Sequence, residues 1–223
     1  MSDRFVLHAS KETVETAFGV TTQRDDYFEP NYNITPGTRV PAIFYEEGNR
    51  RIYDFHWGLI PEGAENEKEG QQNLTLPVEA LNDEKYATAF KQHRCLVPAN
   101  GFYKWKTGEK KSTPFYIRLL SNEVMGLAAL YSVWQSSSGR DVYSFALIST
   151  KANALVQPVD DRMPVIIRPE HYSAWLGEGG PEIAAESAIL KPLDLTEMAV
   201  NRVTEEVNDP DNNHPELIQP IPK

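Results

Sequence analysis

A succession of short apolar runs with strand character constrains the fold of this chain most strongly. The runs are rich in aromatic and β-branched residues and are separated by turn signals. In "RIYDFHWGLIP", Tyr53, Phe55 and Trp57 alternate with other residues, which is the two-residue period of a half-buried strand. Comparable runs are "RFVLHA", "VPAIFY", "RCLVPA", "GFYKWK", "PFYIRLL", "VMGLAALYSVW" and "YSFALIST".

Helix signals are fewer and lie between these runs. Ser10 is placed to cap a helix that Gly19 ends, Asn82 is placed to cap one that ends near His93, and residues 169–177 predict a short third helix. The 223 residues show no repeat or long linker. We therefore predict an α+β fold: a single domain over residues 1–223, with a curved or barrel-like, mostly antiparallel sheet and a few peripheral helices.

Two segments lack the pattern of a core element. Residues 61–72, "PEGAENEKEGQQ", are acidic and rich in glycine, and we predict a surface loop. Residues 208–223 are rich in proline and asparagine and predict an extended tail on the surface.

Charge and cysteine content narrow the classes of function. The formal charge is −10, from 22 basic and 32 acidic residues, which argues against nonspecific nucleic-acid binding but not against a local basic groove. No apolar run reaches the length of a signal peptide or of a membrane span, and the single cysteine, Cys95, predicts an inert core thiol. We expect a cytoplasmic monomer that does not bind membranes.

Generic catalytic motifs do not appear in the chain. There is no glycine-rich phosphate loop and no G-x-S-x-G elbow, and the five histidines are scattered. The sequence therefore predicts neither a metal site nor a cofactor.

"DDRMPVII", residues 160–167, places two carboxylates and an arginine directly before an apolar run. This segment is one of several that, in order along the chain, resemble the SOS response-associated peptidase (SRAP) family. The others are "MSDRF" at the start, "YNITPG", "WGLIP", "NLTLPVE", "HRCLVPANGFYKW" and "VNDPDNNHPELIQP". The resemblance covers essentially the whole chain, and the combination of segments is specific.

This resemblance implies a role in the DNA damage response, on abasic sites in single-stranded DNA. Family members lose Met1 and expose a cysteine whose α-amine and thiol both attack the sugar aldehyde. The amine forms a Schiff base, and the thiol closes it to a stable thiazolidine cross-link between protein and DNA. An asparagine, a glutamate and a histidine orient the sugar and move protons.

Three of these four positions differ in this chain. Ser2 stands at the cysteine position, Lys104 at that of the glutamate and Asp160 at that of the histidine, whereas Asn73 is retained. Thr75 replaces an arginine that family members use on phosphate. A serine hydroxyl is a far poorer nucleophile than a thiolate, so we predict that the stable cross-link is lost.

Two interpretations of these differences remain open. In one, the chain kept its fold and lost its chemistry by drift. In the other, the changes are complementary, and Lys104 and Asp160 form an ion pair with exchanged signs. The amine of Lys104, or the α-amine of Ser2, would then form a transient Schiff base with an aldehyde, as in a lyase, while Asp160 moves protons.

The remaining candidates have both functional and structural interpretations. Arg4 and Arg162 would contact phosphate, or else bind nearby acids. Trp57, like Trp105, would stack on an unpaired base, or else belong to the core. Asn73 would serve the site or only a turn.

The functional hypotheses span three classes, and the question of enzymatic activity is left open. The first is an abasic-site sensor or processor, with peptidase-like or lyase activity. The second is a non-covalent module that binds single-stranded DNA. The third is a protein-interaction scaffold with no DNA role.

Overall fold

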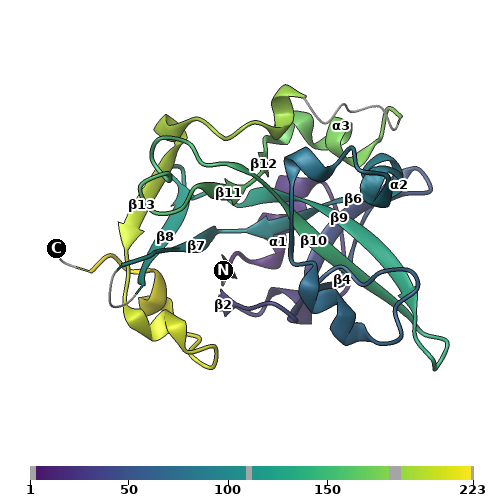
Figure 1. Cartoon of the computed structure of the whole chain (residues 1–223), viewed down its shortest axis with the longest axis horizontal. Coiled ribbons are helices and arrows are strands. Elements are labelled where there is room, and N and C mark those ends of the chain that lie inside the picture. Colours follow the sequence, from purple (N-terminus) through teal and green to yellow (C-terminus); the bar gives the residue numbers. More distant parts are fainter. Residues whose placement is uncertain (1–3, 109–111, 181–186, 222–223) are drawn as a thin grey trace.

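The computed structural model describes residues 4–108, 112–180 and 187–221, which form two β-sheets with short helices around them (Figure 1). The strands of the described residues are β1 (Arg4–Leu7), β2 (Asn31–Ile34), β3 (Arg39–Glu46), β4 (Asn49–Trp57), β5 (Thr75–Pro77), β6 (Arg94–Ala99), β7 (Gly101–Lys106), β8 (Thr113–Leu119), β9 (Met125–Gln135), β10 (Asp141–Lys151), β11 (Arg162–Pro164), β12 (Ile166–Ile167) and β13 (Met198–Arg202).

The helices of the same residues are short. The α-helices are α1 (Lys11–Phe18), α2 (Glu84–Gln92) and α3 (Tyr172–Leu176). The 3-10 helices are η1 (Asp25–Phe28), η2 (Glu67–Gln72), η3 (Val78–Ala80), η4 (Pro169–His171), η5 (Ala188–Leu190), η6 (Leu195–Glu197), η7 (Glu205–Asn208) and η8 (Pro215–Ile218).

Five strands of the larger sheet close into a barrel. β10 pairs with β4, β4 with β3, β3 with β6, β6 with β9, and β9 returns to β10. Within this ring only the β10–β4 pairing is parallel. The predicted α+β fold with a barrel-like, mostly antiparallel sheet is therefore confirmed.

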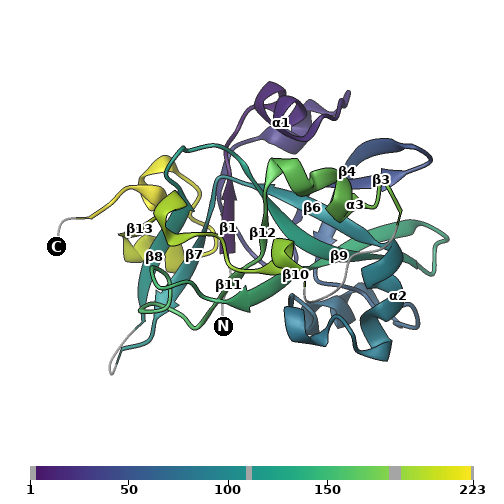
Figure 2. The ribbon, with the colours of Figure 1, turned by 90° about the horizontal axis from the view of Figure 1, so that it is seen from above.

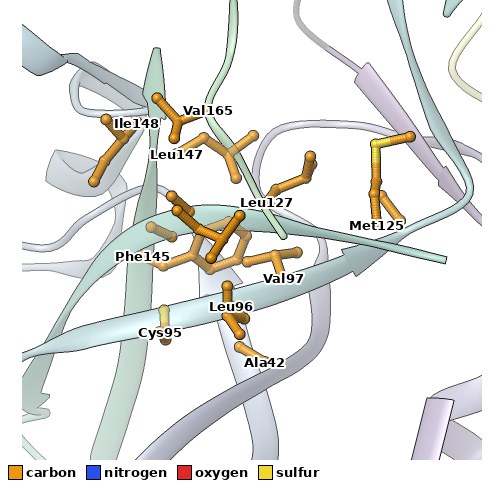
Figure 3. Packing of buried hydrophobic residues seen from close by; sticks show 14 of the residues in the cluster. Ala42, Cys95, Leu96, Val97, Met125, Leu127, Phe145, Leu147, Ile148 and Val165 are labelled. Atoms are coloured by element: carbon orange, nitrogen blue, oxygen red, sulfur yellow. The ribbon is translucent and has the colours of Figure 1, made fainter. Parts of the chain in front are cut away.

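The main core packs against the strands of this barrel. Figure 3 shows Leu96, Val97 and Phe145 packed together with side chains from neighbouring strands. Cys95 is fully buried among them, and this burial raises the pKa of its thiol. The expected inert core cysteine is therefore what the fold contains.

The second sheet carries two of the predicted site residues beside the barrel. Its strand order is β13-β8-β7-β1-β2, with Arg4 on β1 and Lys104 on β7. Figures 1 and 2 place β13 and the C-terminal turns at one end of the molecule, and α2 with the β9–β10 hairpin toward the other.

The predicted N-cap residue is correct for the first helix and lies one residue too early for the second. The Ser10 hydroxyl accepts a hydrogen bond from the Thr13 amide, and Gly19 ends α1 at a φ of 63°. The N-cap position of the second helix is Asp83 rather than the predicted Asn82, and the Asp83 side chain makes no capping hydrogen bond. Both residue types favour this position, so local sequence does not separate them.

The two segments outside the strand pattern are more structured than we predicted. In residues 61–72, Asn66 and Glu69 form a capping box that begins η2, and Gly70 is buried. The expected extended tail begins at the last residue of η7 and contains η8, and it buries Leu217 completely in a small second core. The apolar side chain of Leu217 anchors this polar segment to the fold.

Among the described residues, no helix is long and apolar enough to cross a membrane. The same residues contain no group of three or more His, Cys, Asp or Glu side chains arranged to hold a metal ion.

Three half-buried histidines predict a pH-dependent stability. Burial lowers the pKa of His8, His56 and His93 below the ordinary value of 6.5. The unfolded chain therefore binds more protons between the folded pKa values and 6.5, so the free energy of unfolding falls as pH drops through this window. Urea midpoints should be lower at about pH 5.5 than at about pH 7.5, conditions that lie above the ordinary carboxylate pKa values. The variant His93→Gln should reduce this difference, and identical midpoints in wild type would contradict the prediction.

Candidate functional site

Lys104 and Asp160 meet at the junction of the two sheets. Lys104 comes from β7, and Asp160 lies in the turn before β11. Lys104 Nζ is 3.4 Å from Asp160 Oδ2, and the two side chains are only 6% and 11% exposed. Asp160 Oδ1 also accepts a hydrogen bond from the Arg162 amide at 2.9 Å, which fixes the carboxylate toward the lysine. The hypothesised ion pair between Lys104 and Asp160 is therefore present.

A small cavity lies directly against Lys104. Its volume of about 20 Å³ is close to the space of a single water molecule. It is lined by Arg4, Phe5, Trp57, Thr75, Phe102, Tyr103, Lys104, Leu147, Ser149 and Pro164. The fold thus gathers Arg4 and Lys104 around one point, although a sugar would need the walls to move apart.

Arg4 is held by the C-terminal segment. Its guanidinium donates to Asn33 Oδ1 at 3.0 Å, to Asn208 O at 3.0 Å and to Val207 O. It also lies 5.7 Å from the centre of the Trp105 ring. Burial lowers the pKa of Arg4, and among the described residues no carboxylate forms an ion pair with it. Among the described residues, its acceptors are thus a side-chain amide oxygen and two backbone carbonyl oxygens.

Arg162 is fully engaged within the protein. It forms a two-pronged ion pair with Glu79, with both N–O distances at 3.0 Å, and it donates to Ser149 O at 2.7 Å. The hydrogen bond from Arg162 lowers the pKa of Glu79. A phosphate would have to compete with this carboxylate. Sequence reasoning missed Glu79 as the partner, although it lies in "NLTLPVE", a segment of the family resemblance.

Asn73 ends η2, next to the strand that carries Thr75. Its side-chain amide donates to Leu59 O at 3.2 Å, and its backbone N–H donates to Gly70 O at 2.9 Å. Asn73 does not line the small cavity, whereas Thr75 does. Asn73 therefore anchors the 61–72 segment close to the site.

Trp57 belongs to the core, and the prediction that it stacks on a base is wrong. The side chain is fully buried, its indole N–H donates to Leu74 O at 3.0 Å, and its ring packs against Phe5 and Phe145. The second sheet covers the ring face that a base would need. Trp105 keeps partial exposure, and its indole N–H donates to Asn208 Oδ1 at 2.7 Å. Ser2, the remaining candidate, lies outside the described residues.

The family model of the SOS response associated peptidase (SRAP) matches residues 1–210. The chain belongs to the SRAP family. Abasic site processing protein YoqW of Bacillus subtilis is 32% identical over 98% of this chain and 99% of its own length. Abasic site processing protein YedK of Escherichia coli is 23% identical over 99% and 100%.

Solved structures share the fold of this SRAP protein. A crystal structure of a protein from Bacteroides thetaiotaomicron superposes with a TM-score of 0.84, at 21% identity over 98% of this chain and 99% of the other. At that identity, the likeness supports the fold alone.

Proposed function

We propose that this SRAP protein recognises abasic sites in single-stranded DNA without forming a stable thiol-derived cross-link. The relatives named as abasic site processing proteins support the substrate class. One observation carries the proposal: the two departures from the family pattern meet as a buried ion pair, with Lys104 Nζ 3.4 Å from Asp160 Oδ2. Random loss of function gives no reason for two positions far apart in the sequence to change into residues of opposite charge that pair. The pair therefore favours a polar site that was retained in this chain.

The nature of residue 2 limits the chemistry. Without a thiol, an attacking amine forms an imine with the sugar aldehyde and releases water, and no sulfur closes the imine to a thiazolidine. Such an adduct hydrolyses back to the amine and the aldehyde. The proposed interaction is therefore reversible.

The ion pair argues against Lys104 as the attacking group, which leaves the α-amine of Ser2 as the candidate. Lys104 Nζ lies 3.4 Å from the Asp160 carboxylate, so this amine would have to leave the buried ion pair before it could attack an aldehyde. An α-amine has an ordinary pKa of about 8, so part of it is neutral at neutral pH once Met1 is removed. In this arrangement Lys104 and Asp160 position the sugar and exchange protons with it.

A denaturing gel with single-stranded DNA that bears one abasic site tests this proposal. We expect a wild-type adduct only when borohydride reduces the imine, whereas Ser2→Cys should also give an adduct without borohydride. Lys104→Ala should keep the borohydride-dependent adduct if Ser2 supplies the amine, and lose it if Lys104 does. An adduct of wild type that survives without reductant would contradict the proposed loss of the cross-link.

Binding to the same DNA distinguishes the scaffold alternative. A DNA-binding protein should prefer the abasic strand to an intact strand, and its affinity should fall with salt at a slope of about −0.7 per phosphate contact. Equal and negligible binding of both strands would support a scaffold without a DNA role.

A further inference from the structure

A larger cavity lies outside the Lys104 site and shares no lining residue with it. Its volume is about 430 Å³, within the usual range of ligand-binding clefts. Its lining residues come from the end of β8, the start of β9, β12 and η6. The proposed abasic-site chemistry makes no use of this cavity.

The wall of this cavity is largely apolar and reaches the surface. Its apolar lining includes Leu119, Leu120, Val124, Met125, Ile166 and Leu193. Leu120 is 54% exposed, which makes it the most exposed of the large hydrophobic side chains among the described residues. An exposed leucine at the opening of an apolar cavity is typical of a surface that binds an apolar group.

Acidic side chains lie in the lining of this cavity and near it. Glu123 and Glu197 line the cavity, and Glu170 and Asp194 lie close enough to act on the charge of Arg168. Arg168 is the basic residue of the lining, and its Nη1 donates to Glu197 Oε2 at 2.8 Å. Within the lining, the Glu197 carboxylate is paired with Arg168, so Glu123 leaves a net formal charge of −1 (−2 + 1).

We propose that this cavity docks a segment of a partner protein in which a large apolar side chain is flanked by Lys or Arg. The apolar wall would take the anchor side chain, and the acidic opening would pair with its basic neighbours. Charge complementarity selects this occupant, because the carboxylates that attract a basic segment repel the phosphates of DNA. The surface thus supplies a protein contact on a face separate from the proposed DNA site.

Two fluorescein-labelled peptides test the proposal by anisotropy. One is Lys-Lys-Leu-Leu-Phe-Lys-Lys, and in the other glutamates replace the four lysines. We expect wild type to bind the basic peptide at least about tenfold more tightly than the acidic one. Leu120→Lys and Glu123→Lys should each weaken binding of the basic peptide at least about fivefold.

Matched variants separate this cavity from general attraction to an acidic protein. Val133→Lys places the same charge at an exposed apolar side chain near the far end of β9, and Glu47→Lys matches Glu123→Lys in the turn between β3 and β4. Neither residue lines either cavity. Both controls should bind the peptide nearly as wild type does. Equal losses in the cavity variants and their controls, or no preference for the basic peptide, would overturn the proposal.

Sedimentation measures the competing occupant, a second copy of this chain. A concentration-dependent dimer that Leu120→Lys dissociates would assign the cavity to self-association and overturn the assignment to a partner segment. Abasic-DNA binding should be unchanged in all four variants, so this proposal and the proposed function fail independently.

Discussion

Replacing Asp160 by alanine is expected to destabilise the protein by about 3–5 kcal/mol, the usual result of removing one partner from a buried ion pair. The Lys104 ammonium would stay buried at the junction of the sheets without the carboxylate that lies 3.4 Å from it. The Arg162 amide would also lose its acceptor. Urea unfolding followed by tryptophan fluorescence measures the change in free energy.

Two further variants show whether the ion pair causes this loss. Asp161→Ala removes the neighbouring carboxylate, which is exposed, and should change stability by less than about 0.5 kcal/mol. Lys104→Met combined with Asp160→Ala should recover much of the stability, because no buried charge is then left behind. A loss below about 1 kcal/mol in Asp160→Ala would mean that the pair behaves as an exposed one.

Gly70→Ala is expected to cost about 1–3 kcal/mol and to disturb the placement of Asn73. A Cβ at Gly70 would lie 2.9 Å from Gly58 C and 3.0 Å from Ile60 Cγ1, with Gly58 O closer still. Backbone atoms cannot rotate away as a flexible side chain can, so η2 must move. Because Gly70 O accepts the Asn73 N–H at 2.9 Å, we expect weaker abasic-DNA binding as well as a lower urea midpoint.

Gly63→Ala is the matched control in the same segment. A Cβ at Gly63 meets no atom within 4 Å, so both stability and DNA binding should stay near wild type. Equal behaviour of the two alanine variants would mean that the approach of Gly58 and Gly70 does not position Asn73.

Local pattern in the sequence was sufficient for the fold class and for most elements. The two-residue period of the strands follows from side chains that alternate between the two faces of a sheet, and the Ser10 and Gly19 caps follow from backbone groups within one turn. These causes act between neighbours along the chain, so a single sequence shows them. The departures at Lys104 and Asp160 were also visible, through the family resemblance.

Contacts between distant elements were decided only by the tertiary structure. The period of β4 predicted a buried face, but only the second sheet determined that Trp57 is covered rather than open to a base. Likewise, Arg162 pairs with Glu79, and Arg4 donates to the Asn208 carbonyl oxygen. Both contacts join residues far apart in the chain. Barrel closure and strand register bring such residues together, and both depend on the packing of the whole chain rather than on any local run of residues.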